Sequence, residues 1–114
     1  MIICPLNATP NQEFNIVLNE QNCTIQLRQL DKHIYFSLWL DSDLIIENAI
    51  CLPAQWILQY AREKFSGNFL MLDTGSGDQP QSEANYSGLG DRYQLIYLSA
   101  DEVAGTIAAG AVRL

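Results

Sequence analysis

Apolar and polar positions alternate with a period of two through the first half of the chain. Apolar side chains occupy every second position in three runs, at 14–18, 23–27 and 34–40. Short polar segments separate these runs, and a further brief apolar run, Leu44–Ile46, follows Asp41-Ser42-Asp43. Alternation across short polar turns is typical of antiparallel strands that bury one face. Tyr35 and Trp39 lie on the second face of the third run, so we expect that face to be covered by another part of the fold or by a partner.

The period changes in the middle of the chain. Pro53 fits the first turn of a helix, where its missing N–H costs nothing. Apolar residues then recur with helical spacing at positions 54, 57, 58, 61 and 65, and Gly67 stands at the usual stop position. These features predict one helix over about residues 53–64.

Two more strands are predicted in the second half, one from Asn68 to Leu72, which leads into Asp73, and one over Tyr93–Leu98. The segment between them, 74–90, holds four of the seven glycines and has no periodicity, which predicts a long surface loop.

A capping box formed by Ser99 and Glu102 predicts a short helical turn up to Gly105. The Ala/Gly-rich tail that follows, at about 106–114, is expected to be a loose strand or a mobile arm that orders on a partner.

Together these elements predict a mainly β fold, a small antiparallel barrel or sandwich with one short helix. The 114 residues suit one β-rich domain over 1–114, because a chain of this length buries enough surface for a core of its own. No linker or internal repeat divides the chain.

Composition narrows the classes of function. Hydrophobic residues make up 48% and charged residues 17% of the chain, which indicates an ordered protein. Six basic against thirteen acidic residues give a net charge of −7, which disfavours nucleic-acid binding because that affinity rests on Lys and Arg. No apolar run approaches the roughly 20 residues that a membrane helix needs, so no membrane association is expected.

The residues that usually carry chemistry form no recognisable motif. His33 is expected in an exposed turn, and the three cysteines, Cys4, Cys23 and Cys51, are expected as buried free thiols. Asp73 and Asp78 lie in a segment that lacks the ligand pattern of a calcium loop, and we expect both to be solvated carboxylates. The sequence therefore predicts no catalytic residue, no cofactor and no metal, and a protein that is not an enzyme.

The order of several short segments resembles a known family. These segments are Pro5-Leu6, Pro10 to Phe14, Gly67-Asn68-Phe69, Asp73, Asp78 with Pro80, Leu89-Gly90 and Leu95 to Leu98. Their order and spacing, over about residues 5 to 98, resemble the baseplate plug family of contractile-tailed bacteriophages.

The resemblance implies a structural protein of the virion, made in the host cytoplasm and placed on the axis of the tail baseplate. Its implied partners are baseplate hub and spike or tail-tube proteins, and a homo-oligomer within the symmetric baseplate is compatible with it. The implied role is to help close the tail tube. The candidate partner contacts are Asn11, Gln12, Phe14, Tyr35, Trp39, Asn68, Asp73, Asp78 and Leu89. The alternative is a small β-barrel ligand-binding module or an enzyme accessory subunit that uses the 74–90 loop.

Overall fold

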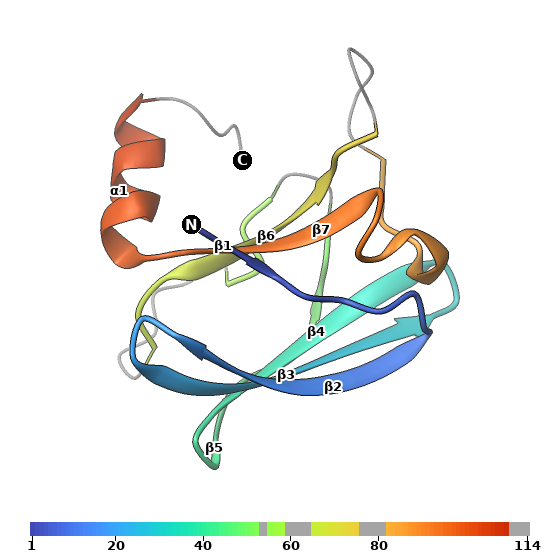
Figure 1. The fold of residues 1–114 in the computed structure, drawn as a ribbon, viewed down its shortest axis with the longest axis horizontal. Helices are drawn as coiled ribbons and strands as arrows, with labels where there is room; N and C mark the ends of the chain where they lie inside the picture. The colour runs from blue at the N-terminus through green and yellow to red at the C-terminus, as the bar shows by residue number, and fades with distance from the viewer. Residues whose placement is uncertain (53–54, 59–64, 76–81, 110–114) are drawn as a thin grey trace.

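Two antiparallel sheets face each other as a sandwich (Figure 1). The computed structural model describes residues 1–52, 55–58, 65–75 and 82–109. Its strands are β1 (Ile2–Cys4), β2 (Asn11–Leu18), β3 (Gln21–Leu30), β4 (His33–Leu40), β5 (Asp43–Ile50), β6 (Asn68–Asp73) and β7 (Tyr93–Leu98), with a short 3-10 helix η1 (Tyr86–Gly88) and one α-helix, α1 (Ala100–Ala109). The sheets do not close into a barrel, so the sandwich form of the predicted fold is confirmed.

The larger sheet has the order β2-β3-β4-β5, and each neighbouring pair is a hairpin. The β2–β3 hairpin runs without a register shift from the pair Asn11–Arg28 to the pair Leu18–Gln21. Asn19 and Glu20 make its turn, and both have positive φ, 51° and 64°. Two such residues fit the twist of a two-residue hairpin loop. The predicted alternation therefore places its apolar set on the inner face of this sheet.

Strand β5 extends beyond the predicted run Leu44–Ile46. The chain adopts a positive φ of 54° at Asn48, and the register between β4 and β5 shifts in this region. The Asn48 N–H donates to the hydroxyl of the buried Ser37 at 2.9 Å. This irregularity interrupts the alternation but lets the strand continue to Ile50.

The smaller sheet has the order β1-β7-β6. The two predicted strands of the second half form β6 and β7, in register from Asn68–Leu98 to Asp73–Tyr93. Strand β1 was not predicted, because three residues are too few to display a period. It pairs with Leu95–Tyr97 of β7 and buries Cys4 in the core.

An aromatic cluster joins the two sheets. Phe36 of β4 contacts Phe69 of β6 with ring centroids 4.9 Å apart, and Phe69 lies 5.4 Å from the ring of Tyr97 on β7. Phe65 stacks on Phe69 at 5.6 Å, and the Tyr97 hydroxyl donates to the Ser66 carbonyl at 2.7 Å. Tilted and offset pairs of this kind stabilise a core beyond the area that they bury.

The predicted helix over 53–64 is wrong at residues 55–58, and its remaining positions lie outside the described residues. Trp56 forms an isolated bridge with Leu70, and the Ile57 N–H donates to the Phe69 carbonyl at 3.0 Å. Trp56, Ile57 and Leu58 are all buried. These three consecutive side chains are buried without a helix, because the segment lies along the edge of β6.

Gly67 does not end a helix in the described residues but permits a close approach. Its φ is 107°, and a Cβ added there would lie 2.5 Å from the Leu98 carbonyl oxygen. Only glycine accepts both the positive φ and this contact without strain. The residue therefore lets the chain enter β6 directly against β7.

The single described α-helix lies near the C-terminus. The predicted capping box is present, because the Ser99 N–H donates to the Glu102 carboxylate at 3.0 Å and the Glu102 N–H donates to the Ser99 hydroxyl at 3.3 Å. The helix continues to Ala109, so the predicted stop at Gly105 and the loose segment from 106 are wrong as far as Ala109. Alanine has the highest helix propensity and outweighs one glycine here. Residues 110–114 lie outside the described part.

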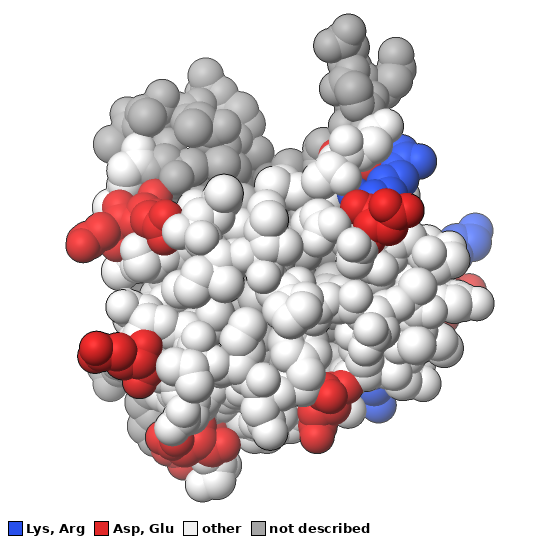
Figure 2. Space-filling model, in the orientation of Figure 1, with Lys and Arg blue, Asp and Glu red and all other residues white. Residues whose placement is uncertain are grey.

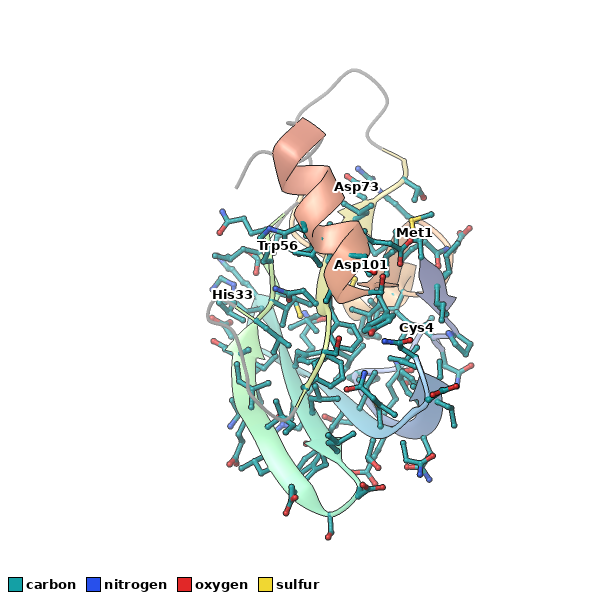
Figure 3. The ribbon with its side chains drawn as sticks, turned by 90° about the vertical axis from the view of Figure 1, so that its left-hand side faces the viewer. Met1, Cys4, His33, Trp56, Asp73 and Asp101 are labelled. Carbon is teal, nitrogen blue, oxygen red and sulfur yellow. The ribbon has the colours of Figure 1, made fainter. Side chains whose placement is uncertain are left out.

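Helix α1 covers part of the outer face of the smaller sheet. Trp56, Leu70, Ile96 and Leu98 form a second buried cluster there, with Val103 of α1 packed against it. In Figure 3, which faces the helix, Met1 and Asp101 lie near the start of α1. The Met1 ammonium pairs with the Glu102 carboxylate and lowers the pKa of Glu102. The N-terminus and the helix therefore meet at one corner.

The thiol expectation is confirmed, because Cys4, Cys23 and Cys51 are free and buried. Burial raises the pKa of the Cys4 and Cys51 thiols to about 12 and that of the Cys23 thiol to about 11. Because the thiolate is the reactive form, we predict that Ellman's reagent at pH 8 modifies none of the three rapidly in the folded protein. The same assay in 6 M guanidinium should titrate all three, and rapid reaction of the folded protein would contradict the burial.

We predict that the aromatic cluster carries much of the stability. Phe36→Ala should lower the free energy of unfolding by about 3–5 kcal/mol, because Phe36 is fully buried between the sheets. Phe14→Ala is the matched control, since Phe14 is half-buried near the edge of the same sheet and should cost less. Urea unfolding measures both, and equal losses would show that the contact between the sheets is not the centre of the core.

Candidate partner-binding surface

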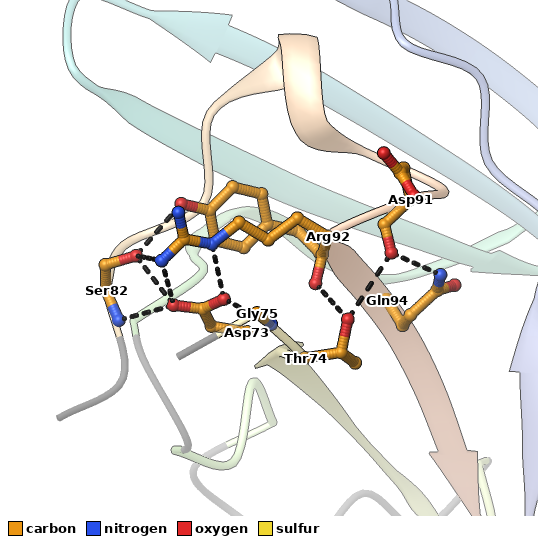
Figure 4. Close-up of polar contacts among 8 residues, drawn as sticks. Asp73, Thr74, Gly75, Ser82, Asp91, Arg92 and Gln94 are labelled. Atoms are coloured by element: carbon orange, nitrogen blue, oxygen red, sulfur yellow. Dashed lines mark hydrogen bonds and ion pairs between the residues drawn. The ribbon is translucent and has the colours of Figure 1, made fainter. Parts of the chain in front are cut away.

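The buried carboxylate of Asp73 ties together three parts of the chain (Figure 4). Arg92 donates through Nε to one carboxylate oxygen at 2.6 Å and through Nη2 to the other at 2.9 Å. The Ser82 hydroxyl and N–H donate at 2.8 and 3.2 Å, and the Gly75 N–H donates at 3.0 Å. The end of β6, the segment that returns to the core and the residue before β7 therefore share one anion.

This network corrects the expectation that Asp73 is a solvated loop carboxylate. Its side chain is fully buried. The Arg92 guanidinium, together with the donors of Ser82 and Gly75, holds the pKa of Asp73 well below its ordinary value, against the opposing effect of burial. The hydrogen bonds from Arg92, Ser82 and Gly75 are all made within the chain, so the arrangement is that of a structural clamp. Asp78 lies outside the described residues.

The segment after residue 81 is part of the folded domain, which corrects the prediction of a surface loop over 74–90. Ala84 and Leu89 are buried in the main core. The Tyr86 N–H donates to the Gln29 side chain at 2.8 Å, and His33 contacts the Glu83 carboxylate. His33 begins β4 and is half-buried, so it is not the free turn residue that the sequence suggested.

Four of the predicted contact residues have internal roles. The Gln12 side chain bonds both the N–H and the carbonyl of Asn7, at 3.0 and 2.7 Å. The Asn68 amide bonds the N–H and the carbonyl of Leu58, at 2.9 and 2.7 Å. Asp73 forms the clamp and Leu89 is a core residue. These side chains hold the ends of the strands in place, and their contact with a partner stays a prediction.

Three predicted contacts lie on the outer face of the larger sheet. The pairing register aligns Asn11, Arg28 and Tyr35 across β2, β3 and β4, with Ile50 of β5 beyond them. A second row crosses the same strands through Asn15, Thr24, Trp39 and Leu44. Tyr35 and Trp39 are half-buried, and Leu44 is 50% exposed. Phe14 points to the opposite, inner face and packs on the core.

Arg28 is a member of this surface that the sequence reasoning missed. Its Nη2 lies 3.5 Å from the Asn48 side-chain oxygen, and its buried Nε has no hydrogen-bond partner within the described part of the chain. A cation placed between Asn11 and Tyr35 interrupts an otherwise neutral row. The available signal was that Arg28 has the same parity as Thr24 on the strand, opposite to the buried positions.

We call this set the outer-face surface: Asn11, Arg28, Tyr35, Trp39, Leu44 and Ile50. It combines half-buried aromatic rings, an exposed apolar side chain and one guanidinium. Aromatic residues and arginine are enriched at protein–protein interfaces, where they supply most of the binding energy. The arrangement is thus suited to a protein partner.

Figure 2 shows one face on which acidic side chains stand apart at the margins while the centre carries no charged group. Among the described residues no three His, Cys, Asp or Glu side chains come together as a metal site. No helix in the described ranges is long and apolar enough to cross a membrane.

We predict that the Asp73 clamp makes stability depend on pH. The folded pKa lies below the unfolded value of about 3.9, so the contribution is complete above about pH 5 and is lost as the pH falls through 3.9 and below. Asp73→Asn should unfold at a lower temperature at pH 7 and show a flatter decline in acid.

The matched control is Asp91→Asn, since Asp91 is exposed and neighbours the same arginine in sequence. Asp91→Asn should melt close to the wild type at every pH. The pKa of Glu102 is also lowered, but both variants retain Glu102, so its contribution is the same in each. Thermal melts between pH 3 and 8 measure the effect. If both variants showed the same acid profile as the wild type, the clamp would not be the titrating element.

Comparison with known proteins identifies a family for the chain. No curated protein matches the chain. A family described as the cyanophage baseplate Pam3 plug gp18 matches residues 1–101. The match covers both sheets, the Asp73 clamp and the outer-face surface, and it ends at the second residue of α1. The chain belongs to the family of cyanophage baseplate plug proteins.

Proposed function

We propose that the protein is a plug on the axis of a phage tail baseplate, where it contacts hub and spike or tail-tube proteins and helps to close the tail tube. The observation that carries this proposal is the family match over residues 1–101. Membership of a baseplate family supports a structural role in the virion tail and association with other baseplate proteins. The partners, the axial position and the closing role are the proposal.

The chemistry of the described residues is compatible with a structural role. In the polar network around Asp73, the carboxylate accepts hydrogen bonds from Ser82 and Arg92 of the same chain. The three thiols have raised pKa values, and thus little thiolate with which to react. The outer-face surface instead offers aromatic rings and a guanidinium to a partner. We therefore assign the protein a role in assembly rather than in catalysis.

The proposal also assigns the contacts. Tyr35 and Trp39 present their rings on the exposed side of the larger sheet, and Asn11 and Arg28 flank Tyr35 across the strands. A partner that covers these rows would bury the rings and give the Arg28 guanidinium an acceptor. The Nη2 of Arg28 has only a 3.5 Å contact with Asn48 among the described residues, so an acceptor on the partner would improve its hydrogen bonding.

The role is tested by removing the gene and examining the particles. We expect purified wild-type tails to contain the chain in a constant ratio to the tube protein, and deletion to yield tails that neither retain DNA nor infect. Quantitative mass spectrometry and plaque titre measure the two results. Infective particles that lack the chain would refute the plug role.

The contact assignment is tested separately, by complementation of the deletion. Trp39→Thr should fold, because threonine suits a strand, yet enter tails several-fold less well than the wild type. Tyr86→Thr is the matched control, since it removes an exposed aromatic ring that belongs to η1 and is not part of the outer-face surface. Equal incorporation of the two variants would remove the outer-face surface from the interface without affecting the assembly role.

A further inference from the structure

The two edges of the larger sheet differ in how well they are protected. Along β5 the register with β4 shifts, and Asn48 has positive φ. Along β2 all eight residues keep one register with β3, and the strand contains neither proline nor lysine. Bulges, proline and lysine are among the means of keeping an edge strand from pairing with another chain. The edge of β2 lacks all three.

The smaller sheet offers no comparable edge in the described part of the chain. Strand β1 has only three residues. The edge of β6 is already partly occupied, because Trp56 bridges Leu70 and the Ile57 N–H donates to the Phe69 carbonyl. The described edge that remains long and regular is therefore that of β2.

The pairing of β2 with β3 identifies which backbone groups of β2 face away from the sheet. The two-residue turn makes Leu18 and Gln21 a hydrogen-bonded pair, so alternate residues of β2 bond to β3 and those between them point away. Those pointing away are Asn11, Glu13, Asn15 and Val17. The Asn11 carbonyl already accepts from the Thr9 hydroxyl at 3.1 Å. Glu13, Asn15 and Val17 thus present a ladder of three N–H and three C=O groups.

The side chains along this ladder define the chemistry of an occupant. Glu13 is exposed and forms no ion pair with any described residue, and the chain has no lysine or arginine before Arg28. Val17 is 62% exposed and lines a surface hollow together with Asn15, Thr24 and Asp41. An added strand would place one residue opposite Glu13 and another, four residues along, opposite Val17. Opposite charges and apolar pairs at such positions stabilise a sheet.

We propose that the edge of β2 binds an extended segment of another baseplate protein, which adds a strand to the larger sheet. The segment carries Lys or Arg opposite Glu13 and, four residues away on the same face, an apolar side chain that lies over Val17 and its hollow. Backbone hydrogen bonds supply affinity in this mode of recognition, and the alternate side chains supply specificity. This inference rests on the proposed role in assembly.

Amide hydrogen exchange tests the ladder in the full chain. The isolated protein is mixed with purified hub, spike and tail-tube proteins encoded with it, and exchange is followed residue by residue. We expect the amides of Glu13, Asn15 and Val17 to exchange rapidly in the free protein and to become at least about tenfold slower in the complex. The amides of Phe14, Ile16 and Leu18, which face β3, should be protected in both states.

Substitutions test the backbone and the charge separately. Glu13→Pro removes an N–H that has no partner among the residues that the structure describes, so the fold should survive while affinity falls about tenfold or more. Glu13→Ala keeps the N–H and should fall much less. Glu13→Lys should weaken binding, whereas the matched control Glu47→Lys, on the opposite edge strand of the same sheet, should not.

The outcomes separate the two proposals. A complex in which the three amides stay unprotected, or in which Glu13→Pro binds like Glu13→Ala, would overturn the strand addition and leave the assembly role intact. Failure of the chain to bind any of the three baseplate proteins would overturn both. Protection of the three amides in the protein alone, rising with its concentration, would show that a second copy of the chain occupies the edge, which also overturns the proposal.

Discussion

Contact between the two sheets through one aromatic cluster is the constraint on which the rest of the structure depends. Phe36 comes from the larger sheet, Phe69 and Tyr97 come from the smaller one, and Phe65 closes the group. Neither sheet could bury its inner face alone, because a single sheet leaves that face in water. The register of β4, β6 and β7 is thereby fixed, since a slip of one residue would turn these rings outward.

The polar network at Asp73 solves a second problem, which is how to return a glycine-rich segment to the core. Core contacts of Ala84 and Leu89 require the chain after residue 81 to be held at the end of β6. A buried carboxylate with an arginine and three further donors does this, and its burial is tolerable only because every donor is in place. The ion pair between Asp73 and Arg92 therefore stabilises the fold. The outer-face surface and the adjoining edge of β2, which we propose as the places where partners bind, belong to the same sheet.

The sequence predicted only part of the candidate site, because the contacts of polar side chains depend on the tertiary structure. Tyr35 and Trp39 were expected at a partner because the second face of a half-exposed strand is usually polar, and two aromatic rings there depart from that pattern. The structure places both on the outer face of the larger sheet, and their contact with a partner stays a prediction. Gln12, Asn68 and Asp73 were expected at a partner, but each side chain satisfies backbone groups or a cation elsewhere in the chain. A single sequence shows that such side chains can form hydrogen bonds but not which groups the fold brings to them. Arg28 was missed because one cation in an alternating run carries no signal of its own.

The sequence by itself determined the strands of the larger sheet, the two long strands of the smaller one and the capping box at Ser99, because each depends on residues close together in the chain. Tertiary structure alone decided the rest. The apolar spacing at 54–65 suits a helix, yet at 55–58 the chain is not helical and bridges β6 through Trp56, since burying Trp56, Ile57 and Leu58 together outweighs local helical preference. The partner of Asp73, the strand status of Ile2–Cys4 and the core role of Leu89 likewise depend on residues far away in sequence. Local patterns report which surface is apolar, and only the packed fold decides what that surface meets.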